Sequence, residues 1–305
     1  MVTMRGPRPM SPGESTTATG SPDLGSRPGG VAVRLIGVVH LYRQSGTDVV
    51  ALRGVDLDVE AGEMVALLGP SGMGKTTVLR LMAGTIKASA GTVKVGEHDL
   101  GRLSAAERRA LRAGDISHII QGTAPNVLPY ATALQNVWFT QHGARRRGHA
   151  PPWRPRELLE MLDLGELADE RLAGLPRGKQ QQVAVAAGVG AGPRLLLADE
   201  PTAQLTERAA VDVVHLLRRI NSELSTTVVI VTHDPAIAAM FPRTVTIRDG
   251  RVGAEGRHGE EFAVVDGSGS IQLPPDVLEI FPPNTRVRVV RGTNWAELRL
   301  PEDEG

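Results

Sequence analysis

Nine consecutive residues have the types and spacing of a loop that binds phosphate. They are Gly69, Pro70, Ser71, Gly72, Met73, Gly74, Lys75, Thr76 and Thr77, and they match the pattern G-x-x-x-x-G-K-[ST] in full. Glycines allow the backbone to curve around a phosphate with its N–H groups pointing inward. Lys75 is then expected to reach the β- and γ-phosphates of a nucleotide, and the Thr76 hydroxyl to hold Mg²⁺. The alternative is a glycine-rich turn that carries a lysine by chance.

The residues on both sides of this loop supply the context that phosphate binding needs. Residues 64–68 are apolar and predict a short buried strand, and residues 76–83 predict a helix that Gly84 ends. The helix N-terminus then points at the phosphate and adds a favourable positive potential. The sequence therefore predicts a nucleotide site here.

A second group of chemically useful residues follows another apolar run. Residues 195–198 predict a buried strand, and Asp199 and Glu200 come directly after it. In open α/β folds the carboxyl ends of the strands are where ligands bind. Asp199 suits Mg²⁺ binding, and Glu200 suits the role of general base toward an attacking water. Taken alone, the pair also fits a solvated strand end.

Composition bounds the class of protein. The chain has 305 residues, 41% of them hydrophobic, which is enough for a sizeable core. Its formal net charge is zero, so bulk charge gives no reason to expect nucleic acid as a partner. Cysteine is absent, which excludes disulfides and thiolate metal sites. No apolar run is long enough to span a bilayer, and residues 1–30 are expected to form a disordered tail.

Strand and helix patterns alternate along the middle of the chain. This alternation predicts an α/β fold with a mainly parallel sheet covered on both faces. Ser104 and Glu107 also have the spacing of a capping box at the start of a helix. The predicted strands are 31–39, 49–59, 64–68, 91–96, 116–120, 194–198, 227–232 and 245–247, and the predicted helices are 76–83, 104–113, 156–164, 180–188 and 209–223.

The motifs occur in an order that resembles a known family. The phosphate loop, Gln121, the run 199–202 (DEPT) and the run 231–234 (VTHD) follow one another as in the ATP-binding subunits of ABC transporters. The resemblance covers about residues 31–252. It implies a P-loop NTPase fold of the ABC ATPase type, with a mainly parallel sheet, an antiparallel β subdomain and a helical subdomain. It also implies ATP and Mg²⁺ as cofactors.

The same resemblance implies roles for three further residues. Gln121 would sense Mg²⁺ and the membrane partner, His233 would contact the γ-phosphate, and Tyr42 would stack on adenine. Each has an ordinary alternative: a loop residue, a neighbour of a helix N-cap and a core aromatic. Residues 121–129 and 133–137 are similar to those of lipoprotein-releasing and macrolide-exporter ATPases. That similarity implies an integral-membrane permease as partner, and a cytoplasmic chain that is peripheral on the inner face of the cell membrane.

The chain departs from the family at one motif. Where the family has Leu-Ser-Gly-Gly-Gln or -Glu, residues 175–179 read LPRGK, so that Pro176 replaces the serine and Arg177 the first glycine. Gly178 is retained and is expected to face nucleotide across a dimer. Lys179 stands at the acidic or amide position, and Thr206 replaces the aspartate of a later loop. The changes also fit drift or an altered partner, and Arg177 and Lys179 can bind phosphate by charge.

We expect three parts in the chain: the tail 1–30, an ABC ATP-binding domain at 31–255 and a β-rich C-terminal domain at 261–305. The last of these is similar to swapped-hairpin domains of transition-state regulators and antitoxins, although Ser270 replaces their usual arginine. An ordinary β-rich appendage is the alternative.

The function expected from all this is ATP binding and hydrolysis that drives a permease, in a homodimer or heterodimer with another ABC ATPase. The alternative is a low-turnover nucleotide-binding regulatory subunit, the degenerate half of an asymmetric pair. A soluble ABC ATPase without a permease is a third class. Its members commonly carry two cassettes on one chain, whereas this chain has one set of motifs.

Overall fold

A computed structural model describes residues 29–44, 47–257, 260–265, 269–271, 273, 275–282, 284–291 and 296–300. The tail predicted for residues 1–30 lies outside these residues except for its last two. In the described part of the chain, no helix is both long and apolar enough to cross a membrane.

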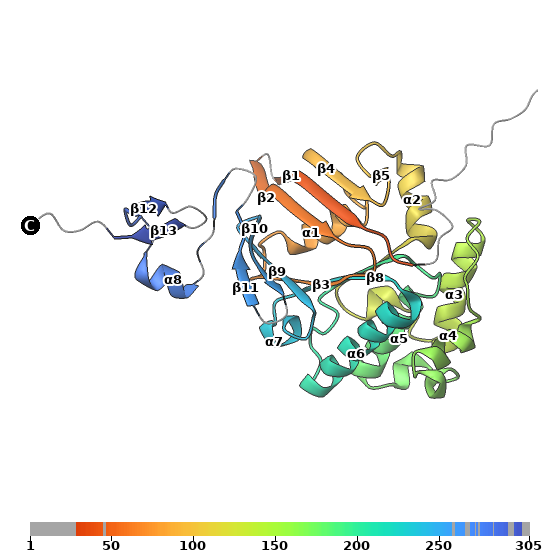
Figure 1. The fold of residues 1–305 in the computed structure, drawn as a ribbon. Helices are drawn as coiled ribbons and strands as arrows, with labels where there is room; N and C mark the ends of the chain where they lie inside the picture. Colours follow the sequence, from red (N-terminus) through yellow and green to blue (C-terminus); the bar gives the residue numbers. More distant parts are fainter. Residues whose placement is uncertain are drawn as a thin grey trace, which may run out of the picture.

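A seven-stranded sheet forms the centre of the molecule, with the strand order β11-β10-β9-β3-β8-β7-β6 (Figure 1). The neighbouring strands β9, β3, β8, β7 and β6 all run parallel. Beyond β9, β10 pairs antiparallel with β9, and β11 pairs antiparallel with β10. The mainly parallel α/β sheet expected from the sequence is therefore confirmed. The bounds are β3 (Met64–Leu68), β6 (Ile116–Ile119), β7 (Leu195–Asp199), β8 (Thr227–Thr232), β9 (Arg243–Arg248), β10 (Arg251–Arg257) and β11 (Glu260–Ala263).

A second, antiparallel sheet has the order β2-β1-β4-β5. It consists of β1 (Val33–Gln44), β2 (Thr47–Val59), β4 (Ala90–Val95) and β5 (His98–Asp99). Five helices contact the large sheet: α1 (Lys75–Met82), α2 (Ala105–Gly114), α5 (Arg177–Gly188), α6 (Glu207–Leu224) and α7 (Pro235–Ala238). Helix α3 (Ala133–Arg145) packs on α5, and α4 (Pro155–Met161) packs on α3. Short 3₁₀ turns, η1 (Ala124–Asn126), η2 (Gly165–Leu167) and η3 (Leu172–Gly174), join them.

The central strands are buried on both faces because their side chains alternate between two cores. Val228 and Ile230 of β8 belong to the core shared with α5 and α6, whereas Val229 and Val231 belong to the core shared with α1 and the antiparallel sheet. The helix that follows the phosphate loop and the helix that carries residues 177–188 therefore pack on opposite faces of the sheet.

Element boundaries differ from the prediction where local backbone geometry decides them. The capping box at Ser104 and Glu107 is present as predicted. By contrast, α5 begins at Arg177 rather than at residue 180, because Pro176 occupies the N-cap position with an extended ψ of 149°. α4 ends at Met161, and Asp163 has a φ of 57°, which is incompatible with continuing the helix.

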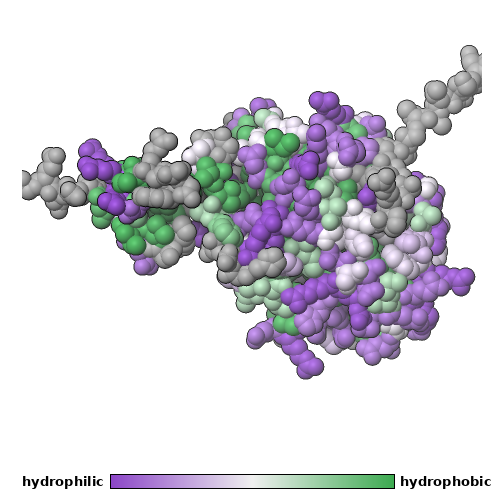
Figure 2. All heavy atoms as spheres, in the orientation of Figure 1, coloured by the Kyte–Doolittle hydropathy of each residue, from purple (hydrophilic) through white to green (hydrophobic). Residues whose placement is uncertain are grey.

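The C-terminal elements α8 (Pro275–Ile280), β12 (Arg288–Arg291) and β13 (Ala296–Arg299) lie together, apart from the two sheets (Figure 1). α8 is a helix that the sequence analysis does not predict. Figure 2 shows hydrophobic residues on the surface of this region. Ile280 and Val289 have exposed fractions of 61% and 58%. Since β11 pairs with β10 in the large sheet, a β-rich domain at 261–305 stays a prediction.

A buried arginine ties the two sheets together. Arg243 of β9 is 6% exposed, and its guanidinium donates to the carboxylates of Glu63 and Glu255 at 2.9–3.2 Å. It also donates to the Asp58 carbonyl of β2 at 2.7 Å. Burial raises the pKa of Glu255, but the hydrogen bonds from Arg243 and Arg257 outweigh it, so the pKa is lowered overall. The guanidinium thus joins β9, β10 and β2.

We expect Arg243→Met to destabilise the fold by about 3 kcal/mol, because it leaves two carboxylates without their partner. This is the lower end of the range for a broken buried pair, since Glu63 and Glu255 keep exposed fractions of 19% and 21%. Urea unfolding followed by circular dichroism measures the change, with Arg208→Met on exposed α6 surface as the control. Equal midpoints for the two variants would show that the arginine does not tie the sheets.

Candidate nucleotide site

The phosphate loop joins β3 to α1, and two of its glycines have no room for a side chain. Gly69 has a φ of 152°, and a Cβ there would lie 2.2 Å from the Ile247 carbonyl oxygen. Gly74 has a φ of 96°, and a Cβ there would lie 2.6 Å from the Ala51 carbonyl oxygen. The backbone therefore takes a path that L-residues with side chains rarely adopt.

Lys75 lies under this loop. Its side chain is 5% exposed, and its Nζ donates to the carbonyl oxygens of Gly69 at 2.6 Å and Pro70 at 2.7 Å. Burial lowers the pKa of Lys75, and the carboxylates of Glu200 and Asp199 act in the opposite direction. The ammonium group is thus held inside the curve of the loop, where it can meet phosphate oxygens.

Asp199 lies at the end of β7, beside the first turn of α1. The Thr76 hydroxyl donates to Asp199 Oδ1 at 3.2 Å. Asp199 is 6% exposed, and its pKa is raised by burial and by Glu200, against the hydrogen bond from Thr76 and the charge of Lys75. A hydroxyl and a carboxylate at this distance form the oxygen-rich donor set that Mg²⁺ prefers, so the residues fit the metal.

Glu200 and His233 contact each other across two neighbouring strand ends. Both carboxylate oxygens of Glu200 lie 2.9 Å from His233 Nδ1. Glu200 has a φ of 48°, and its backbone N–H donates to the Val231 carbonyl at 3.0 Å, which fixes the strained turn. His233 follows β8 directly. The histidine can therefore orient the carboxylate and respond to a ligand beside it.

Tyr42 lies against α1. Its hydroxyl is 3.2 Å from Thr77 Oγ1 and 3.4 Å from Arg80 Nη1, and its ring meets His40 edge-on at 4.6 Å. The structure thus joins Tyr42 to the helix of the phosphate loop. Its stacking on adenine stays a prediction.

Gln121 is exposed and follows β6, at the same edge of the sheet as Asp199 and Glu200. Its loop is held by Asn126, a residue that the sequence analysis did not single out. Asn126 Nδ2 donates to the Ile120 carbonyl at 2.7 Å, and its Oδ1 accepts from the Ile120 N–H at 3.1 Å. The sequence carries one signal for this role, because Pro125 and Asn126 are both residue types that favour turns and asparagine side chains bind nearby backbone groups.

Residues 175–179 lie at the start of α5. The N-cap Pro176 provides no side-chain hydrogen bond to the helix. Gly178 packs on α6, because a Cβ there would lie 2.7 Å from the Ala209 Cβ. Lys179 Nζ lies 3.9 Å from Glu166 Oε1. Within one chain, Gly178 is therefore joined to α6 and not to the phosphate loop, and its contact with nucleotide stays a prediction.

Thr206 caps the neighbouring helix. It is the N-cap of α6, and its hydroxyl accepts from the Ala209 N–H at 3.4 Å. Threonine and aspartate are both favoured at this position of a helix, so Thr206 is a suitable N-cap for α6.

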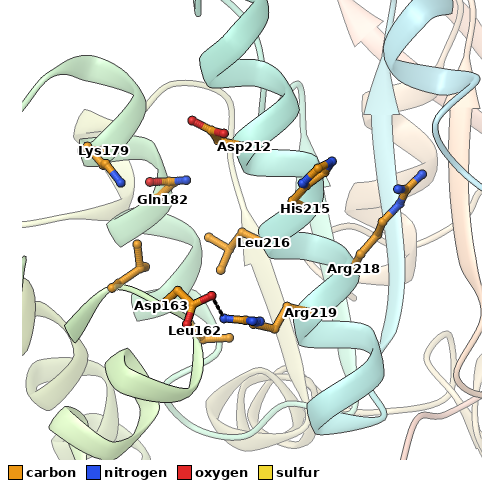
Figure 3. A pocket seen from close by; sticks show the side chains of 10 residues that line it. Leu162, Asp163, Lys179, Gln182, Asp212, His215, Leu216, Arg218 and Arg219 are labelled. Atoms are coloured by element: carbon orange, nitrogen blue, oxygen red, sulfur yellow. Dashed lines mark ion pairs between the residues drawn. The ribbon is translucent and has the colours of Figure 1, made fainter. Parts of the chain in front are cut away.

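An open pocket of about 490 Å³ lies between α5 and α6 (Figure 3). Its lining includes Lys179, Gln182 and His215, and an ion pair joins Arg219 to Asp163 at its rim. Residues 162–164, which follow α4, complete the lining, and neither the phosphate loop nor Asp199 nor Glu200 contributes to it. It is therefore separate from the candidate nucleotide site.

Comparison with known proteins gives the family. A family model described as ABC transporter matches residues 52–203. The lipoprotein-releasing system ATP-binding protein LolD of Anaeromyxobacter dehalogenans (strain 2CP-C) is 40% identical, over 74% of this chain and 94% of that protein. The macrolide export ATP-binding/permease protein MacB 1/2 of Paracoccus denitrificans (strain Pd 1222) is 37% identical over 77% of this chain, which spans only 35% of that protein.

A solved structure supports the same family assignment. A dimeric ATP-binding cassette, MJ0796, in a post-hydrolysis state with ADP and Pi, superposes with a TM-score of 0.63 at 31% identity. The match covers 74% of this chain and 98% of the cassette. Together with the phosphate loop and the acidic strand end, these likenesses assign the chain to the ABC transporter family, as an ATP-binding and ATP-hydrolysing subunit.

Proposed function

We propose that this subunit drives an integral-membrane permease of the lipoprotein-releasing or macrolide-exporter kind. The observation that carries the proposal is the cluster of Lys75, Asp199, Glu200 and His233 at one edge of the sheet, where β3, β7 and β8 end. The relatives named LolD and MacB, an ATP-binding protein and an ATP-binding/permease protein, support it. The chain would attach to the inner face of the membrane through that permease.

Different residues bind the phosphates of ATP and the Mg²⁺ ion. The loop from Gly69 to Thr77 cradles the phosphates with its N–H groups, and Lys75 meets the β- and γ-phosphates. Mg²⁺ would be held by Thr76, Asp199 and Gln121, and when bound it neutralises phosphate charge.

Glu200 accepts the proton of the water that attacks the γ-phosphorus in line, and His233 holds the Glu200 carboxylate in place while contacting the γ-phosphate. Tyr42 would stack on the adenine.

A second copy or a related subunit completes the site. We propose a dimer in which ATP lies between the phosphate loop of one subunit and the start of α5 in the other, near Gly178. The solved cassette MJ0796 is dimeric. In a homodimer of this chain, both sites would face Pro176 and Arg177.

The altered residues at the start of α5 favour an asymmetric pair. Pro176 has no hydroxyl or N–H to donate, and Arg177 places bulk where a glycine would let the backbone approach phosphate. A heterodimer would combine the intact phosphate loop of this chain with a complete motif from its partner. The second candidate, a low-turnover regulatory subunit, rests on the same observation.

We predict that Lys75→Ala weakens ATP binding at least tenfold, about 1.4 kcal/mol, because it removes the charge that meets the phosphates. Equilibrium binding of a fluorescent ATP analogue measures the loss. Lys94→Ala, an exposed position on β4, is the matched control and should bind as wild type does. Unchanged affinity in Lys75→Ala would contradict the assignment of this loop as the ATP site.

We predict that Glu200→Gln stabilises the dimer with ATP, because the amide keeps the shape of the side chain but accepts no proton. Gel filtration with ATP should show a larger species for the variant than for wild type, alone or with a partner subunit. If neither protein dimerises with any partner, the sandwich of ATP between two subunits is wrong for this chain.

We predict slow turnover by the homodimer, and recovery in the double variant Pro176→Ser with Arg177→Gly. Loss of one well-placed hydrogen-bond donor lowers a rate roughly 10²–10³-fold. Here the serine hydroxyl and the close backbone approach that glycine allows are both lost, so we expect an effect of at least that size. Steady-state ATPase activity of the two proteins measures the difference. If wild type turns over as fast as the variant, then Arg177 or Lys179 supplies the missing contacts and the asymmetric pair is not needed.

A further inference from the structure

The chain distributes its charge unevenly. Lysine plus arginine equals aspartate plus glutamate over the whole sequence, at 34 each. Yet between Asp115 and Glu157 there is no acidic residue, while five arginines and three histidines occur there. This stretch also contains Trp138 and Trp153, two of the three tryptophans. A neutral protein therefore carries one basic and aromatic segment, which includes α3.

Several residues of this segment are exposed, on α3 and in the two positions directly after it. Trp138 and Phe139 are exposed to 47% and 58%, and the Trp138 ring stacks on His142 at 4.9 Å with 16° between the planes. Positions 138, 142 and 146 share one side of a helix because they lie four residues apart. We call Trp138, Phe139, His142, Arg145, Arg146 and Arg147 the aromatic–basic face.

The arginines of this face are not neutralised by carboxylates. Arg154 and Arg156, further along, pair with Glu157 at 3.8 Å and Asp169 at 2.8 Å. In the described chain, by contrast, no ion pair involves Arg145, Arg146 or Arg147.

Their recorded hydrogen bonds stay within one turn of the helix. Arg145 donates to Gln141 Oε1 at 3.5 Å and Arg147 to the Gly143 carbonyl at 3.3 Å. Three adjacent positive charges thus face outward beside two exposed aromatic rings.

These features match the boundary of an anionic bilayer. Tryptophan rings settle at the level of the lipid headgroups, and arginine side chains are attracted to anionic lipids. Binding of a helix to a membrane surface grows with the apolar area that it buries there and with the attraction of its basic residues to anionic lipids. Nucleic acid also supplies anions and bases that stack on aromatic rings, but the zero net charge of the chain gives no reason to expect it as a partner. We propose that the aromatic–basic face binds anionic phospholipid at the membrane surface, next to any contact with the permease.

Vesicle sedimentation with the purified full chain tests this surface. We expect binding to vesicles that mix phosphatidylcholine with phosphatidylglycerol, weaker binding as salt is added, and little binding to phosphatidylcholine alone. Replacing Arg145, Arg146 and Arg147 together by Gln should lower the partition coefficient on the order of a hundredfold, since each arginine near an anionic surface contributes about fivefold. Trp138→Ala should lower it further.

The matched control replaces three exposed arginines elsewhere, Arg43, Arg102 and Arg208, by Gln, which removes the same charge. The side chains of Arg43 and Arg102 are 84% and 86% exposed. The control should keep its vesicle binding, and all variants should bind a fluorescent ATP analogue as wild type does. That second readout separates failure of this inference from failure of the proposed nucleotide site.

Two outcomes would overturn the proposal. One is an equal loss of vesicle binding in the α3 variant and the control, which would reduce the effect to net charge. The other is binding only to membranes that contain the permease and not to lipid vesicles, which would assign the aromatic–basic face to a protein partner.

Discussion

Burial of the Lys75 ammonium group is the constraint on which the nucleotide site depends. Lys75 is a buried residue whose charge needs partners, and the chain provides the carbonyl oxygens of Gly69 and Pro70. Those carbonyls can turn inward only because the loop contains glycines with positive φ. The acidic side chains of Asp199 and Glu200 add opposite charge nearby. The loop, the lysine and the end of β7 therefore form one electrostatic unit.

The loop is also held from outside, by the turn between β9 and β10. The Ile247 carbonyl closes on Gly69, and the Asp249 N–H donates to the Met73 sulfur at 3.4 Å. The Gly250 carbonyl accepts from the Arg53 N–H at 2.8 Å, which links the same turn to β2. Because Arg243 anchors the start of β9 among β10 and β2, the two sheets position the phosphate loop together.

The start of α5, where we propose that a second subunit meets nucleotide, is held in place by different contacts. Gly178 and Ala209 allow α5 and α6 to approach closely, and Thr206 caps α6 beside them. The start of α5 is thus held close to α6, while Pro176 provides no side-chain hydrogen bond to the helix that it begins.

Much of this protein could be predicted from the sequence alone. The phosphate loop and the acidic strand end follow local patterns, and alternation of strands and helices predicted the parallel sheet, because these signals depend on residues close together in the chain. Gln121 and His233 were singled out by the family resemblance of the motif order, and their roles stay predictions.

Tertiary structure decided the rest: Asn126 holding the Gln121 loop, Arg243 joining three strands, and Glu200 meeting His233. Gly178, expected to face nucleotide, packs on Ala209 in the single chain. Such contacts join residues that only folding brings together, and a linear pattern carries no record of which distant partner a buried polar group will find.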